Sequence, residues 1–188
     1  KAHSRTAITK GYVRAINFEE AAPFIEQWHY SGRVPKGKNL FYGWFPDEDL
    51  FTKPYAVACY GDGVNPIQAE FLAQHTGHTI SRLELVELKR LCRQDPRIES
   101  MPLTHFLSRC NKLLRQEGYR YLVSFSDPQR YHNGGIYKAA SFQHIGKTNA
   151  EYHAVDAHGN QHHRRVYYSH AKRKGITPAQ ARRELGLS

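Results

Sequence analysis

Asp127 is a residue whose type and position in this chain could support chemistry. It follows a β-rich run over residues 119–125 and stands directly before Pro128. A carboxylate at the carboxyl end of a strand can accept a proton from an amine, or hold that amine by a hydrogen bond. An aspartate before a proline is also a common turn residue. Both interpretations stay open at this point.

Tyr137 lies ten residues further on, in a segment that begins with a glycine turn and has the pattern of a short helix. A tyrosine hydroxyl stays protonated at neutral pH, so Tyr137 could act as a general acid. The alternative is a core aromatic residue, because Ile136, Ala140 and Phe142 around it are packing residues.

His29 and Tyr30 end a predicted helix and precede a basic loop, residues 33–38. Histidine is the usual proton shuttle or metal ligand near neutral pH. At a helix C-terminus it is equally a capping residue that the helix dipole favours. With Asp127 and His132, His29 could hold a divalent metal such as iron, although the sequence has no HxH or HExxH spacing.

Three arginines, Arg90, Arg93 and Arg97, surround the end of a predicted strand and the polar loop after it. Guanidinium groups in such a place could neutralise the phosphates of a cofactor or of DNA. Alternatively, their aliphatic stems simply cover the end of the sheet.

The elements that must position these residues form one unit over residues 83–142. The sequence predicts a strand, a helix with an apolar stripe that stops at Gly118, a second strand, and a glycine turn leading into a short helix and the start of another strand. Their ranges are 83–92, 103–117, 119–125 and 132–142. A strand–helix–strand unit with a polar loop is where α/β proteins place ligands, so we expect the active site there.

The rest of the chain supplies further strands and helices around this unit. We expect strands at 11–16, 40–45 and 55–60, helices at 18–28 and 68–73, a hairpin from 151–156 to 163–168, and a basic helix to residue 185. The helix after Asn17 contains Pro23, which predicts a kink or a later start. The expected fold is one α/β domain over residues 1–188, with a mixed sheet between helices on both faces and a C-terminal hairpin and basic helical tail.

The composition favours a polyanionic partner in a reducing compartment. The 188 residues are 40% hydrophobic, which is enough for one packed domain. A net charge of +10 favours nucleic acid as a partner, with the basic residues of 151–188 as phosphate contacts, although a merely solvated basic surface is the alternative. Three cysteines without CxxC spacing, no membrane-length apolar run and no visible signal peptide lead us to expect a cytoplasmic protein with buried thiols.

The order of elements resembles the GNAT acyltransferase fold. In that family a central strand, the following loop and a helix hold the pyrophosphate of acetyl-CoA, and a later helix carries an Asn and a Tyr-x-x-x-Gly-Phe ending whose Tyr protonates the leaving thiolate. Asn133 and residues 137–142 match that ending, with Ser141 in the glycine position. The resemblance implies acetyl-CoA or a related acyl donor, held by Arg90, Arg93 and Asn133. The family's glycine-containing loop is replaced here by residues 93–100, which contain no glycine.

A closer resemblance covers most of the chain and is to the Mom family of bacteriophage DNA-modification proteins. It rests on Trp-His-Tyr-Ser at 28–31, Leu-Lys-Arg-Leu-Cys at 88–92, Ser-Phe-Ser-Asp-Pro at 124–128, and the segment 133–142. That family is a divergent GNAT branch that converts the exocyclic amine of adenine in double-stranded phage DNA to a carbamoylmethyl derivative, which protects the phage genome from host restriction. By this resemblance the active-site residues are His29, Tyr30, Arg90, Asp127 and Tyr137.

Three other functions remain possible from the residues. One is an ordinary GNAT enzyme that acetylates an amine of a protein, an RNA or a small molecule. Another is an adenine methyltransferase, although Gln129 and Arg130 replace the Pro-Tyr of its Asp-Pro-Pro-Tyr motif. The third is a DNA-binding protein without catalysis. The Mom-type product also needs more than simple acyl transfer, because a carbamoylmethyl group is joined through its methylene carbon, so a metal step, another donor or a rearrangement is implied.

Overall fold

The computed structural model divides the chain into two compact units, Lys1–His144 and Ile145–Ser188, which are described separately. It describes residues 11–46, 52–62, 67–94, 102–127, 133–148 and 154–188. The single domain expected over residues 1–188 stays a prediction. No helix of the described residues has the length and apolar character that crossing a membrane requires.

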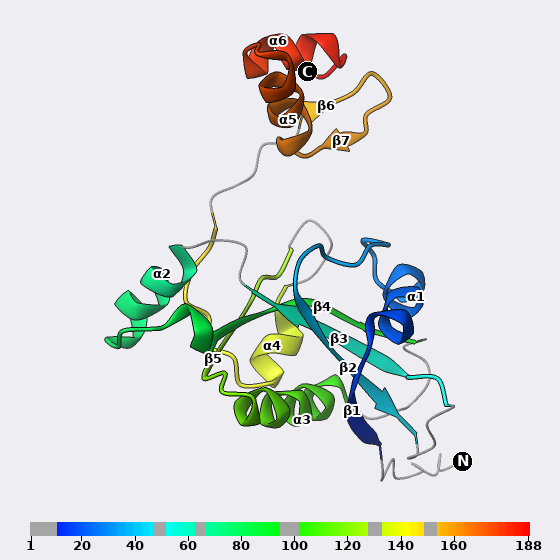
Figure 1. The fold of residues 1–188 in the computed structure, drawn as a ribbon, viewed down its shortest axis with the longest axis vertical. Coiled ribbons are helices and arrows are strands. Elements are labelled where there is room, and N and C mark those ends of the chain that lie inside the picture. The colour runs from blue at the N-terminus through cyan, green and yellow to red at the C-terminus, as the bar shows by residue number, and fades with distance from the viewer. Residues whose placement is uncertain (1–10, 47–51, 63–66, 95–101, 128–132, 149–153) are drawn as a thin grey trace, which may run out of the picture. The chain divides into compact units, whose positions relative to one another are not determined.

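The first unit is built on a five-stranded mixed sheet, as predicted (Figure 1). The strands run in the order β1 (Tyr12–Ile16), β2 (Asn39–Phe45), β3 (Ala56–Gly61), β4 (Leu85–Arg93) and β5 (Tyr121–Ser124). Neighbours from β1 to β4 are antiparallel, whereas β5 is parallel to β4. A parallel pair needs a crossover connection, and α3 (Leu103–Gln116) provides it.

Helices cover both faces of this sheet, which confirms the predicted architecture (Figure 1). Side chains alternate along β2, so Tyr42 and Trp44 lie on one face while Phe41 and Phe45 lie on the other. The first face packs against α3 through its apolar stripe, and we call it the α3 face. The second packs against α1 (Phe18–Trp28), and we call it the α1 face.

Helix α1 begins at Phe18, directly after its cap, and continues through Pro23, so the later start is wrong and the kink stays a prediction. The Asn17 side chain accepts from the Glu20 backbone N–H, and the Glu20 carboxylate accepts from the Asn17 backbone N–H. A hydrogen bond from Arg14 also holds the pKa of Glu20 below its ordinary value. Pro23 removes one N–H donor, a cost that this reciprocal cap and the buried Phe24 and Ile25 offset.

Several elements of the first unit differ from the prediction, among them β5, which begins at Tyr121 rather than Tyr119. The expected strand start at Leu83 is a 3-10 turn, η1 (Arg82–Glu84), so β4 begins only at Leu85. The expected strand after Phe142 is absent, since residues 142–148 form no strand. Helix α2 (Ile67–Thr76) is longer than the predicted 68–73. The short helix near Tyr137 is α4 (Gly135–Ala139).

The second unit contains a short hairpin and two helices, and it corrects the prediction for residues 163–168. Strands β6 (Ala154–Val155) and β7 (Gln161–His162) form the hairpin, but the chain then enters α5 (Arg165–Lys174) instead of a second long strand. Tyr167 and Ala171 lie one turn apart and are both buried. Their packing against Ala181 and Leu187 therefore outweighs the β-propensity of the local sequence.

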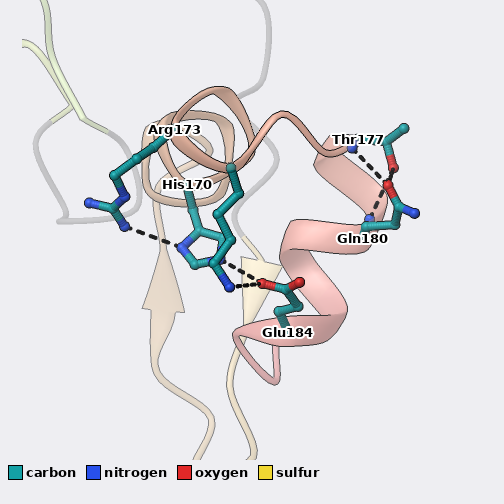
Figure 2. Close-up of polar contacts among 6 residues, drawn as sticks. His170, Arg173, Thr177, Gln180 and Glu184 are labelled. Carbon is teal, nitrogen blue, oxygen red and sulfur yellow. Dashed lines mark hydrogen bonds and ion pairs between the residues drawn. The ribbon is translucent and has the colours of Figure 1, made fainter.

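The two helices of this unit are joined by a tight turn with its own polar contacts (Figure 2). Helix α5 ends at Gly175, which has a positive φ, and α6 (Pro178–Glu184) begins after Thr177. Thr177 and Gln180 cap α6 reciprocally. The Glu184 carboxylate accepts hydrogen bonds from Lys174 and His170 of α5, 2.8 Å each. The predicted basic tail at 172–174 is thus the last turn of a packed helix.

Acid is expected to weaken the hairpin of the second unit through Asp156. Hydrogen bonds from His162, from Asn160 and from the backbone N–H of His158 lower the pKa of this carboxylate well below its ordinary range. A lowered folded pKa contributes stability that is present above about pH 4, the unfolded value, and is lost as the pH falls towards the folded value. Asp156→Asn should weaken the hairpin at neutral pH and remove this acid dependence. The measurement is thermal loss of the Val155 amide NMR signal at several pH values.

The control for this prediction is Glu26→Gln, which neutralises an exposed carboxylate of α1 in the first unit. It should leave the acid dependence of the Val155 signal unchanged. An Asp156→Asn variant with the same acid profile as the parent would show that Asp156 does not carry the effect.

Candidate active site

Strand β4 has an open backbone edge beyond the point where β5 ends. The two strands pair from Leu85 opposite Tyr121 to Leu88 opposite Ser124, where the Ser124 hydroxyl donates to the Leu88 carbonyl oxygen at 3.2 Å. β4 continues to Arg93, and no strand among the described residues pairs with it on this side. The N–H and C=O groups of such an edge can bind an extended ligand with amide groups.

A bulge in β4 decides to which face the side chains near this edge point. Leu88 pairs with Tyr60 and Arg90 with Cys59, so Lys89 is an extra residue in the register. Beyond the bulge, Leu91 packs against the α3-face cluster and Cys92 belongs to the α1-face cluster.

The same alternation places the two predicted cofactor-binding arginines on opposite faces of the sheet. Arg90 lies with Cys92 on the α1 face, and Arg93 lies with Leu91 on the α3 face. The structure therefore does not bring Arg90 and Arg93 together. Arg97 lies outside the described residues.

Arg90 instead joins the segment that contains His29 and Tyr30. Its Nε donates to the Arg33 carbonyl oxygen at 3.3 Å. The Ser31 hydroxyl lies 3.3 Å from that same oxygen and 2.8 Å from His29 Nδ1. The loop after α1 and the bulge of β4 are thus linked by polar contacts on the α1 face.

His29 occupies the C-cap position of α1, which confirms its interpretation as a helix-end residue. The side chain is buried, and its Nδ1 accepts a hydrogen bond from the Ser31 backbone N–H at 3.1 Å. The neutral ring therefore carries its proton on Nε2 and presents a donor there. Tyr30 packs its ring against His29 at 4.3 Å between centroids and is 56% exposed.

This tautomer bears on the suggested metal. A metal-bound histidine usually donates its second ring N–H to an acceptor, whereas Nδ1 of His29 is itself an acceptor. In the described part of the chain, no three His, Cys, Asp or Glu side chains come together as a ligand set. His132 lies outside that part. The metal site at His29 and Asp127 stays a hypothesis that the donor geometry does not favour.

Tyr137 packs on the α3 face, and the helix that carries it begins next to the loop that carries Asp127. Asp127 is half-buried, three residues beyond the end of β5. Gly134, with φ 76°, begins α4 so close to Ser126 that an added Cβ would lie 3.7 Å from the Ser126 hydroxyl and 3.9 Å from the Tyr137 ring. Helix α4 therefore starts against the loop that carries Asp127.

Asn133 and Ser141 support this arrangement locally. The Asn133 side-chain oxygen accepts from the Gly135 backbone N–H at 3.0 Å, which holds this side chain at the start of α4. Ser141 has φ 63°, a left-handed conformation that favours glycine. This explains why the GNAT pattern has a glycine where this chain has Ser141.

Tyr60 is a site neighbour that the sequence analysis did not single out. It is completely buried on the α3 face, and its hydroxyl lies beside the Cys110 thiol without a hydrogen bond of ordinary geometry to the described residues. Burial raises the pKa of Tyr60, and nearby Cys110, Tyr42 and Tyr137 raise it further. Tyr137 packs against the same cluster that contains Tyr60. The alternation within residues 55–60 was the signal that could have placed Tyr60 there.

None of the three cysteines is a nucleophile. Cys59, Cys92 and Cys110 are free and buried, as predicted. Burial raises the pKa of each thiol to about 12, so a reactive thiolate does not form near neutral pH.

The fold and the open β4 edge define a member of the GNAT acetyltransferase fold class. The chain resembles the aminoglycoside N-acetyltransferase AAC(6')-Iy, solved with a CoA-containing bisubstrate analogue (TM-score 0.52, 9% identity, 77% of this chain and 98% of that one) and with CoA (0.51, 11%, 75% and 98%). It also resembles an aminoglycoside acetyltransferase from an uncultured soil metagenomic sample, solved with sisomicin (0.50, 7%, 78% and 97%). The chain belongs to the Mom protein family, which it matches over residues 10–185. A search among curated proteins gave no match.

Proposed function

We propose that this protein modifies DNA by converting the exocyclic amine of adenine to a carbamoylmethyl derivative, which protects phage DNA from restriction in the cytoplasm of the bacterial host. The observation that carries the proposal is membership of the Mom family over residues 10–185. The GNAT fold supports transfer of an acyl-type group as the underlying chemistry.

The open edge of β4 and the start of α3 fit a coenzyme A donor. The pantetheine arm carries amides that can pair with the free edge of β4. Helix α3 begins at Leu103 without a side-chain cap and without an acidic residue in its first turn, so its N–H groups favour a phosphate. Arg93, on the same face, adds positive charge. Acetyl-CoA or a related donor would supply an activated carbon there.

Asp127 and Tyr137 divide the proton transfers between them. The Asp127 carboxylate accepts a proton from the adenine amine, and the Tyr137 hydroxyl donates one to the leaving group. The target adenine has to leave the base stack to reach them, which costs a few kcal/mol. The exposed ring of Tyr30, which packs against His29, offers a surface on which such a base can stack.

The product restricts the chemistry of the donor. Attack of an amine on an acetyl thioester forms a bond to the carbonyl carbon and gives an N-acetyl group. A carbamoylmethyl group is joined through its methylene carbon. The donor therefore reacts at that carbon, or a further step follows acyl transfer.

Mass spectrometry of nucleosides from plasmid DNA tests the proposal, in bacteria that express the full chain or its Asp127→Asn variant. We expect deoxyadenosine heavier by a carbamoylmethyl group with the parent, and a yield about 10²–10⁴-fold lower with the variant, which keeps the shape of the side chain but cannot accept a proton. An N-acetyl or N-methyl product would contradict the proposed reaction. Unmodified DNA from well-expressed protein would favour the second candidate, an ordinary GNAT N-acetyltransferase acting on a protein, RNA or small-molecule amine.

A further inference from the structure

The positive charge of this chain is concentrated in its second unit. Residues 145–188 contain eight Lys and Arg but only three Asp and Glu, so they carry half of the net charge of +10. The two acidic residues that the structure describes there, Asp156 and Glu184, are both engaged within the unit. The excess charge is therefore not neutralised internally.

Some of these cations hold the unit together. Lys174 forms an ion pair with Glu184 at 2.8 Å, and Arg173 contacts His170 Nδ1 at 3.3 Å (Figure 2). Arg182 lies over the ring of Tyr167, 5.7 Å from its centroid. The contacts of Lys174 and Arg182 join α5 to α6, whereas Arg173 and His170 both belong to α5.

Other cations lie on the opposite side of α5. Arg165, Tyr168 and Lys172 follow one another at spacings of three and four, on the side of the helix away from buried Tyr167 and Ala171. All three are exposed, and within the described residues neither Arg165 nor Lys172 forms an ion pair. A rise of 1.5 Å per residue separates these two cations by about 10 Å along the axis, close to the ~12 Å width of the DNA major groove.

We propose that this stripe, with Arg164 beside it, binds the phosphate backbone of duplex DNA. We call Arg164, Arg165, Tyr168 and Lys172 the α5 stripe. Two or three cations and a phenol hydroxyl are the groups that proteins use to contact phosphates. An anionic membrane fits less well, because a membrane helix turns a continuous apolar face outward, whereas Tyr167 and Ala171 of α5 pack against α6 and Val166 is its one exposed aliphatic residue. This inference rests on the proposed function, since it takes DNA as the substrate.

Two double variants with the same loss of charge test the α5 stripe in the full chain. Arg165→Gln with Lys172→Gln removes one Arg and one Lys from the stripe. Arg173→Gln with Lys174→Gln removes the same pair of residue types from the last turn of α5, where both contact other side chains. Binding to a short fluorescent duplex is followed by anisotropy between 50 and 200 mM salt, and thermal unfolding checks that each variant is folded.

The slope of log affinity against log salt concentration is expected to be smaller in magnitude by about 2 for the stripe variant than for the parent. Between 50 and 200 mM salt the variant should therefore lose about tenfold less affinity than the parent does. The control variant should keep the parent slope. Equal slopes for both variants would overturn the inference, because they would mean that the charge acts diffusely. Equally strong binding of the parent to phosphatidylserine vesicles would overturn it too. If the stripe variant keeps both adenine modification and the parent salt slope, the α5 stripe alone is refuted. If the parent neither binds the duplex nor modifies adenine, the proposed function is refuted as well.

Discussion

Tyr137→Phe is expected to lower the yield of modified adenine by about 10²–10⁴-fold, the range that a positioned general acid contributes. The substitution removes only the hydroxyl. The ring keeps its packing on the α3-face cluster and its contact with Phe142, 5.4 Å between centroids. The fold should therefore be unaffected, and the loss should appear in the rate of the reaction. A time course of nucleoside mass spectrometry after induction measures it.

The matched control is Tyr12→Phe, the same change at an exposed position on β1. It should modify DNA at the parent rate. If Tyr137→Phe also modified DNA at the parent rate, Tyr137 would be a packing residue of α4, and the proton donor would have to be sought elsewhere.

Leu107→Ala is expected to lower the free energy of unfolding by about 2–5 kcal/mol, the usual cost of a cavity at a fully buried leucine. Leu107 is 0% exposed and belongs to the cluster that joins α3 to the sheet. The same cluster supports Tyr137, so the variant should lose activity at lower temperature than the parent. Denaturant unfolding can be followed through the fluorescence of Trp44, a member of this cluster.

Leu83→Ala provides the control for this measurement. Leu83 lies in η1 and is 87% exposed, so the same truncation there should change the free energy of unfolding by less than about 0.5 kcal/mol. Equal losses at Leu83 and Leu107 would contradict the assignment of the core to the α3 face.

Elements whose signals are local were predictable from the sequence. Asn17 and Glu20 define the start of α1 because a capping box needs only four consecutive residues. The apolar stripe of α3 and its end before Gly118 are equally local. The prediction placed Leu83 in the strand because it is an apolar residue next to other strand-forming residues. In the structure Ser81 caps a 3-10 turn that contains Leu83.

The candidate site residues that lie within a short stretch of chain stay a prediction. Asp127, Asn133 and Tyr137 lie within eleven residues, and the structure places α4 against the loop after β5. The sequence could not show that Arg90 and Arg93 lie on opposite faces of the sheet. The bulge at Lys89 shifts the alternation of side chains along β4, and only the pairing with β3 reveals that bulge. The buried position of Tyr60 beside Tyr137 likewise needs β3, α3 and α4 together.

The sequence by itself determined the mixed α/β class, most helices and strands, and the neighbourhood of Asp127 and Tyr137, because periodicity, caps and turns act within a few residues. Only the tertiary structure decided that residues 165–168 are helical, that Arg90 contacts the Arg33 carbonyl in the loop after α1, and that β4 extends beyond β5 without a further strand partner among the described residues. These features depend on contacts between residues far apart in the chain. Packing of Tyr167 and Ala171 against α6 outweighs local propensity, and strand pairing fixes the register that no single strand contains.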